Sequence, residues 1–182
     1  MKWLSDRIVA ARGWTVVGEK PPFPKAVIVG APHTSNWDFF LFLAVVHRLG
    51  FDASFLIKDT FMVGPLGWLM GRLGAIAVDR SSHGDLVRSA VEAFETSDHM
   101  YLVIAPEGTR GVADAWKSGF WRIADAADIP VVMGFIDGVT KTTGLGPSAL
   151  IDGDPSAWIE QASVFYEDKR GVDPKNRTPV VL

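Results

Sequence analysis

A continuous apolar run at residues 26–30, with the sequence AVIVG, constrains the fold of this chain more than any other feature. A strand that is apolar on both faces is typical of the centre of a parallel sheet, where helices cover both sides. Segments with apolar residues at helical spacing separate this run from further short apolar runs, at residues 53–57, 75–78, 101–105 and 130–136. The alternation predicts a single α/β domain with a mostly parallel central sheet flanked by helices on both faces.

The size and composition of the chain limit the functions that it can have. The 182 residues are enough for one compact domain, which we divide into an N-terminal helix and linker (1–25), a core that carries the motifs (26–137) and a C-terminal helix and tail (138–182). Because the chain has no cysteine, disulfides, thiolate metal ligands and a thiolate nucleophile are excluded. The net charge of −3 argues against nucleic acid as a partner.

Polar residues follow the predicted strands at the point where each strand ends. His33 and Asp38 follow the first run, Asp79 and Arg80 the third, and residues 107–110 the fourth, while Lys58 follows the second run directly. Ligands of open α/β sheets bind at the carboxyl ends of the strands. Six cations in the middle of the chain would form an anion site if they gather there, and they are otherwise scattered surface charges: Lys58, Arg72, Arg80, Arg110, Lys117 and Arg122.

His33 and Asp38 have the spacing of an acid–base pair. With Ser35 as the predicted N-cap of the next helix, Asp38 lies in the first helical turn and can reach the His33 imidazole. The structural alternative is that Asp38 belongs to a capping box and His33 bonds to backbone. The chain has no Gly-x-Ser-x-Gly elbow and no His-x-x-x-His spacing, so we expect neither a serine nucleophile nor a metal, but action on a substrate hydroxyl.

The turn Glu107-Gly108-Thr109-Arg110 is a candidate for substrate binding. Gly108 allows the backbone to turn or to approach a ligand closely, and the planar Arg110 guanidinium suits a phosphate. Glu107 would hold Arg110 or bind a hydroxyl. The structural alternative is an ordinary turn with a local ion pair and no role in binding. The apolar segments 39–46 and 61–73 line an acyl groove in one interpretation and are core in the other.

Taken together, the motifs resemble those of the glycerolipid acyltransferases typified by lysophosphatidic acid acyltransferase. Four blocks match in order over about residues 26–137: the His-x4-Asp block from His33 to Asp38, GAIAVDR at 74–80, APEGTR at 105–110 and IPVV at 129–132. The resemblance implies that His33 is the general base on the acceptor hydroxyl and that Asp38 orients it. Further binding residues that it implies are Arg80, Glu107, Gly108, Thr109 and Arg110 for the acceptor, and Lys58 and Lys117 as phosphate contacts.

The same resemblance implies the substrates and the location. The donor would be an acyl thioester, acyl-CoA or acyl-ACP, as a co-substrate with no further cofactor, and the acceptor a lysophospholipid or another glycerol-phosphate-like hydroxyl compound in phospholipid biosynthesis. No apolar stretch reaches the length of about 18 residues that a transmembrane helix needs, so we expect a cytoplasmic protein that binds peripherally to the inner face of the membrane. A thioester or lipid-ester hydrolase and a non-catalytic lipid-binding module at the membrane surface remain alternatives.

Overall fold

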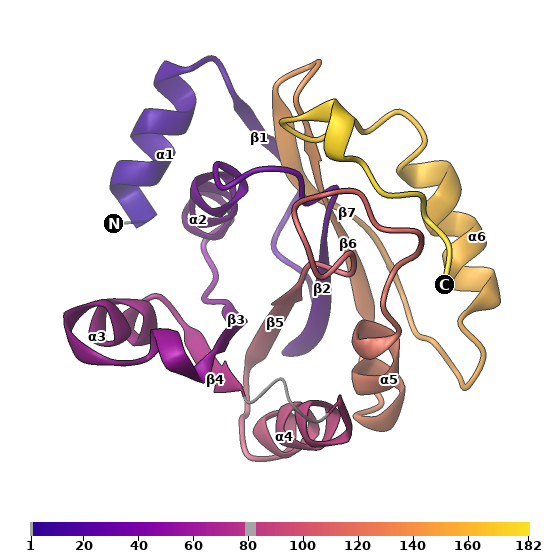
Figure 1. The fold of residues 1–182 in the computed structure, drawn as a ribbon. Coiled ribbons are helices and arrows are strands. Elements are labelled where there is room, and N and C mark those ends of the chain that lie inside the picture. The colour runs from indigo at the N-terminus through magenta and orange to yellow at the C-terminus, as the bar shows by residue number, and fades with distance from the viewer. Residues whose placement is uncertain (1, 79–82) are drawn as a thin grey trace.

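The computed structural model describes residues 2–78 and 83–182, whose strands form a seven-stranded sheet (Figure 1). The order across the sheet is β1-β7-β6-β2-β5-β3-β4, in which β6, β2, β5, β3 and β4 run parallel and β7 runs antiparallel to β6. The predicted α/β class with a mostly parallel sheet is therefore confirmed. The strands are β1 (Thr15–Val17), β2 (Lys25–Ala31), β3 (Ser54–Lys58), β4 (Ala75–Val78), β5 (Met100–Ile104), β6 (Val131–Asp137) and β7 (Thr142–Ala149).

Helices cover both faces of the sheet, as the apolar run at residues 26–30 predicts. Val27 and Val29 of β2 pack into a core with α4, α5 and α6, whereas Ile28 packs into a second core with α2. Helix α1 packs on α2, on the same side of the sheet (Figure 1). The helices are α1 (Lys2–Ala11), α2 (Asp38–Leu49), α3 (Gly64–Arg72), α4 (His83–Glu95), α5 (Gly119–Ala126) and α6 (Ser156–Phe165), with the short 3₁₀ helices η1 (Asp59–Phe61) and η2 (Pro174–Asn176).

Strand β2 lies between β6 and β5 and brings the chain to the candidate site. Val27 and Val29 are completely buried, and burying a valine side chain fully stabilises a fold by about 1.5–3 kcal/mol. The strand ends at Ala31, which is joined to Pro32 by a cis peptide bond, and His33 follows. Because β2, β3 and β5 are parallel, the segments that follow them leave the sheet at the same edge.

Two segments of the sheet region differ from the sequence prediction. Strand β7 was not predicted, because the sequence TTGLGPSA contains two glycines and a proline, which are unfavourable in strands. Its pairing with β6 and β1 outweighs this weak local preference. The apolar residues 179–182, which an edge strand would also suit, join no strand of the described sheet, and the carbonyl of Val181 instead accepts a hydrogen bond from Trp116 N.

The two apolar segments considered for an acyl groove have different environments. In α2, the side chains of Leu41, Ala44 and Val46 are at most 1% exposed and belong to the core. In the segment 61–73, by contrast, large apolar side chains point to solvent, and a core role for the whole segment is therefore wrong. The side chains that are more than half exposed there are Phe61, Val63, Leu66 and Trp68.

Candidate active site

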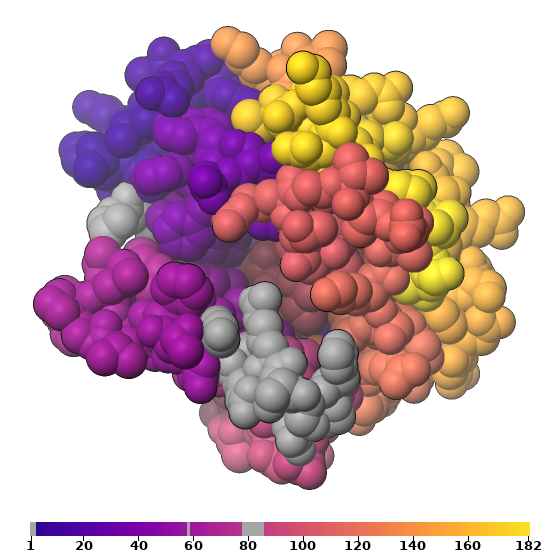
Figure 2. All heavy atoms as spheres, viewed as in Figure 1, coloured from indigo at the N-terminus to yellow at the C-terminus, as the bar shows by residue number. Residues whose placement is uncertain are grey.

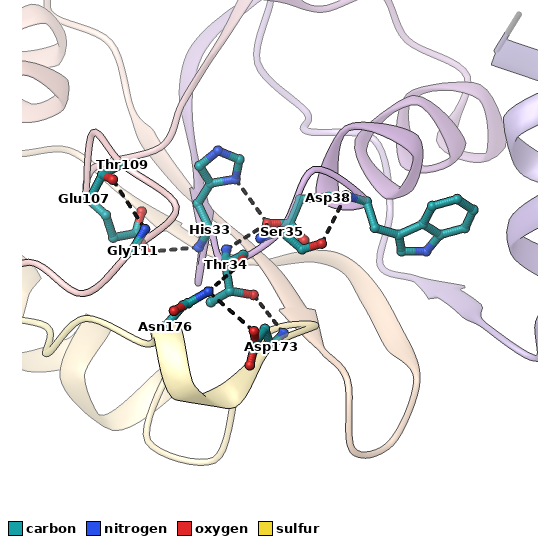
Figure 3. Close-up of polar contacts among 10 residues, drawn as sticks. His33, Thr34, Ser35, Asp38, Glu107, Thr109, Gly111, Asp173 and Asn176 are labelled. Carbon is teal, nitrogen blue, oxygen red and sulfur yellow. Dashed lines mark hydrogen bonds and ion pairs between the residues drawn. The ribbon is translucent and has the colours of Figure 1, made fainter.

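Asp38 holds the loop that carries His33. Its Oδ2 atom accepts hydrogen bonds from His33 Nδ1 at 3.0 Å, Thr34 N at 2.7 Å and Ser35 N at 2.9 Å (Figure 3). The Asp38 side chain is 4% exposed and lies in the first turn of α2, where the helix dipole stabilises a negative charge. Because a carboxylate only accepts, Nδ1 of His33 carries the proton of this hydrogen bond. In the neutral imidazole, Nε2 then has a free lone pair, and this atom points away from Asp38 in Figure 3.

The start of α2 differs in detail from the prediction. The helix begins at Asp38, and Trp37 occupies the N-cap position without a side-chain hydrogen bond. Ser35 Oγ accepts from Trp37 N at 3.1 Å, while the Asp38 carboxylate reaches back to Ser35 N, as in a capping box. The capping interpretation and the dyad interpretation of Asp38 are therefore compatible, since one oxygen serves both.

Glu107 joins the loop after β5 to the His33 loop. The residue is 2% exposed, and its Oε1 atom accepts a hydrogen bond from His33 N at 3.0 Å. Burial raises the pKa of Glu107, and this effect outweighs the hydrogen bond from His33 N and the attraction of the nearby imidazole. The other oxygen, Oε2, is buried and has no hydrogen-bond partner among the described residues.

The loop at residues 105–118 presents the rest of the predicted binding motif. Gly108 has a φ of +67°, and a Cβ atom there would lie 2.8 Å from Lys117 Nζ, so Lys117 lies directly over this glycine. Lys117 N also donates to Pro106 O at 2.8 Å, which closes the loop. Thr109 and Arg110 are exposed at its tip, and Thr109 Oγ1 accepts from Gly111 N. Figure 2 shows the surface hollowed beside this coral loop, on the side of α2 and α3.

Of the two roles considered for Glu107, the ion pair with Arg110 is not formed. Within residues 2–78 and 83–182, Glu107 is turned into the protein against His33, and Arg110 is exposed without a carboxylate partner. Gly108 therefore separates a buried acid from an exposed base. Four of the predicted site residues come together at this edge of the sheet. They are His33 with Asp38, and Glu107 with Lys117 on the same loop.

The remaining predicted cations are not all at this edge. Lys58 is the last residue of β3, at the same edge as His33, and Arg80 lies outside the described residues, as does Asp79. Arg72 lines a hollow of about 360 Å³ that also borders Ser54 and Met100, the first residues of β3 and β5. Since this hollow lies at the amino ends of the strands, the six cations do not all gather at the edge where His33 lies.

The sequence did not predict that the C-terminal tail touches the site. Asn176 Nδ2 donates to Thr34 O at 3.2 Å, and Asp173 N donates to Thr34 Oγ1 at 3.0 Å (Figure 3). Thr34 is therefore a contact of the C-terminal tail. Nothing in the polar sequence after residue 168 signals these contacts. In the part of the chain that the structure describes, no three His, Asp or Glu side chains are grouped so that they could hold a metal ion.

The fold and this geometry define an α/β protein with a histidine–aspartate dyad at the carboxyl edge of a parallel sheet. A scan against protein-family models matches residues 14–134 to the family described as Acyltransferase, which is more than half of the chain. The chain therefore belongs to the Acyltransferase family, and the family inferred from the motif blocks is confirmed.

Comparison with solved structures gives a match over nearly the whole chain. The fold is similar to the crystal structure of the 1-acyl-sn-glycerophosphate (LPA) acyltransferase PlsC from Thermotoga maritima, with a TM-score of 0.66 and 20% sequence identity. The similarity covers 94% of this chain and 76% of the other. At this identity it establishes the common fold alone. A search of curated proteins gives no match.

Proposed function

We propose that this protein is an O-acyltransferase that moves a fatty acyl group from an acyl thioester to a hydroxyl of a lysophospholipid or a related glycerol-phosphate-like acceptor. The observation that carries the proposal is the 3.0 Å contact between His33 Nδ1 and the buried Asp38 carboxylate, in a member of the Acyltransferase family. The acceptor class is supported by the motif blocks and by the name of the structural neighbour, a 1-acyl-sn-glycerophosphate acyltransferase. The donor carrier is coenzyme A or acyl carrier protein.

The reaction follows from the state of the imidazole. Nε2 of His33 takes the proton of the acceptor hydroxyl, and the oxygen attacks the thioester carbonyl. The new C–O bond forms, and the C–S bond breaks when the tetrahedral intermediate collapses. The imidazolium, which Asp38 stabilises meanwhile, returns its proton to the leaving thiolate, so the products are an ester and a free thiol. No acyl-enzyme is needed, which agrees with a chain that has no cysteine.

Charged groups around the dyad suit a phosphate-bearing acceptor. Glu107, which the motif assigns to the acceptor site, lies directly beside the dyad through its hydrogen bond to His33 N. Arg110 and Lys117 are exposed on the same loop and bind the phosphate, with Lys58 and Arg80 as further predicted contacts.

We also propose that the protein binds peripherally to a bilayer, at the inner face of the cytoplasmic membrane. The η1–α3 surface, formed by Phe61, Val63, Leu66 and Trp68, is apolar and exposed, and it follows β3 at the edge of the sheet where His33 lies. The Arg72 guanidinium lies 5.1 Å from the Trp68 ring, and tryptophan is enriched at membrane interfaces. Among the described helices, none is long and apolar enough to cross a membrane.

The transfer reaction is tested with the wild-type protein and two histidine variants. The protein is incubated with mixed acyl thioesters and a panel of lysophospholipids and glycerol phosphates, and the products are identified by mass spectrometry. We expect an acylated acceptor from wild type, none from His33→Ala, and wild-type turnover from His47→Ala, the matched control, because His47 is exposed on α2. Full activity of His33→Ala contradicts the mechanism, and free fatty acid formed without acceptor supports the hydrolase instead.

Membrane binding is tested by flotation with vesicles of phosphatidylcholine and phosphatidylglycerol. Replacing Leu66 and Trp68 by serine removes apolar area whose burial contributes about 1.5–3 kcal/mol for each side chain, so we expect the bound fraction to fall at least about tenfold. Val164→Ser is the control, because Val164 is 70% exposed on α6, outside the η1–α3 surface. Equal flotation of wild type and the double variant contradicts this binding surface.

A further inference from the structure

Thr34, the residue between His33 and the start of the α2 turn, is held on every side by polar contacts. Its N–H donates to Asp38 Oδ2 at 2.7 Å, its carbonyl accepts from Asn176 Nδ2 at 3.2 Å, and its hydroxyl accepts from Asp173 N at 3.0 Å. Thr34 is 3% exposed. Two of its three polar groups therefore depend on a segment that lies about 140 residues further along the chain.

This segment, residues 171–181, is called the C-terminal strap here, and it is anchored to the sheet before it reaches the site. Gly171 N donates to Ile136 O at 3.1 Å, and Gly138 N donates to Gly171 O at 2.9 Å, at the end of β6. A Cβ atom at Gly171 would lie 2.6 Å from Thr34 Oγ1, so the strap backbone lies directly on the Thr34 side chain. The hydrogen bonds of Gly171 to the end of β6 therefore fix the position of the strap where it contacts the His33 loop.

The strap then continues to the second loop of the site. Arg177 Nη2 donates to Tyr166 O at 2.8 Å, which ties the middle of the strap to the end of α6. Beyond it, Ala113 N donates to Thr178 Oγ1 at 3.1 Å, and Trp116 N donates to Val181 O at 2.7 Å. In Figure 1 the yellow strap passes beside both the loop after β2 and the loop after β5. One segment thus connects the two loops that supply His33 and Glu107.

We propose that the C-terminal strap positions the catalytic dyad, with Asn176 and Thr34 as its positioning residues. The peptide group between His33 and Thr34 gives its N–H to Asp38, so a shift of Thr34 moves the imidazole and one partner of the Asp38 carboxylate together. Asn176 and Asp173 prevent this shift by holding the carbonyl and the hydroxyl of Thr34. The strap lies outside residues 14–134, which the family model covers.

The activity experiment removes single contacts of the strap and rests on the proposed acyl transfer. Asn176→Ala removes the hydrogen bond to Thr34 O, and Thr34→Val removes the hydroxyl while keeping the shape of the side chain. We expect kcat to fall about 10- to 100-fold in both variants, since a displacement of about 1 Å at a catalytic group costs up to about 100-fold, with the KM for the thioester within about twofold. Lys175→Ala, an exposed neighbour in η2, and Thr34→Ser, which keeps the hydroxyl, retain wild-type kcat.

A second readout follows the imidazole and needs no substrate. The ring nitrogens of the four histidines are observed by ¹⁵N NMR at a pH where the rings are neutral, and His33 is assigned by its absence in His33→Ala. Wild type gives the Nδ1–H tautomer of His33 that Asp38 selects, and Asn176→Ala gives a mixture with the Nε2–H form. A folded variant that has only lost stability keeps the wild-type tautomer.

The outcomes separate this proposal from the proposed function. The positioning role of the strap is overturned if Asn176→Ala has wild-type kcat or the same kcat as Lys175→Ala. It is also overturned if His33 keeps its wild-type tautomer in Asn176→Ala. If wild type transfers no acyl group to any acceptor, acyl transfer fails as the function, while the tautomer still decides the role of the strap.

Discussion

Asp38→Asn separates the charge of this residue from its shape. An amide oxygen can take the place of Oδ2, but the three hydrogen bonds from His33 Nδ1, Thr34 N and Ser35 N then end on a neutral acceptor. A hydrogen bond to a charged group contributes about 1.5–3 kcal/mol, and a neutral one about 0.5–1.5 kcal/mol. The new NH₂ group takes the place of Oδ1, which is buried without a partner among the described residues, and an unsatisfied donor there costs about 1–3 kcal/mol.

The expected effects on stability and on activity differ in size. Because removing a buried charge offsets part of these losses, we expect the free energy of unfolding to fall by about 2–4 kcal/mol. A neutral amide stabilises the imidazolium poorly, and it can also present its NH₂ group to Nδ1 and select the wrong tautomer of His33. We therefore expect kcat to fall by about 10²- to 10⁴-fold.

The assay compares the variant with wild type at a temperature where both are folded. Urea unfolding followed by tryptophan fluorescence gives the free energy of unfolding, and thioester consumption with acceptor gives kcat. Asp98→Asn is the matched control and is expected to change neither quantity, because Asp98 is exposed. If Asp38→Asn loses stability but keeps kcat within about threefold of wild type, Asp38 is a capping residue alone and the argument for a dyad is refuted.

Three further substitutions test the binding loop. Arg110→Ala is expected to raise the KM for a phosphate-bearing acceptor at least about tenfold, because the exposed guanidinium binds phosphate, and the KM for the donor less than about twofold. Both values are measured by steady-state kinetics. Equal effects on the two substrates would remove Arg110 from the acceptor site. Gly108→Ala places a Cβ atom 2.8 Å from Lys117 Nζ at a φ of +67°. We expect the free energy of unfolding, measured in urea, to fall by about 1–3 kcal/mol and acceptor binding to weaken. An unchanged KM for the acceptor would exclude Lys117 from the acceptor site. Burial raises the pKa of Glu107 in the folded protein, so wild type loses stability as the pH rises from about 4.3, the value of an unperturbed glutamate, through the folded pKa. Glu107→Gln removes this loss and is expected to be more stable than wild type at pH 7–8 and to lose that advantage near pH 4; a difference that does not change with pH in urea titrations would contradict the buried carboxylate.

The elements predicted best are those whose signals lie within a few residues of one another. The run AVIVG predicts β2 because a strand that is apolar on both faces is stable only when both faces are covered, and helices cover both faces of this sheet. Gly50 ends α2 with a φ of 70°, as a glycine after the last apolar turn predicts. The contact of Asp38 with His33 was also predictable, because only five positions separate them and the chain folds back at the start of a helix.

Glu107 shows where a local motif stops being informative. Its neighbours are compatible with an ion pair to Arg110 or with binding of a hydroxyl, but the Glu107 carboxylate accepts a hydrogen bond from His33 N, 74 positions away in the sequence. That contact exists because β2 and β5 are adjacent parallel strands, which brings the two following loops together. The inward direction of Glu107 and the outward direction of Arg110 depend on this pairing.

The sequence alone therefore specifies the α/β class, the strand ends and the dyad, since burial patterns and short-range geometry depend on residues that are close together in the sequence. The tertiary structure specifies the pairing of β7 with β6, the buried position of Glu107 and the hydrogen bonds between the C-terminal strap and Thr34. These contacts join residues that are far apart along the chain, and no single segment has a local preference strong enough to predict them. Folding brings them together because the sheet, once formed, places the ends of distant strands side by side.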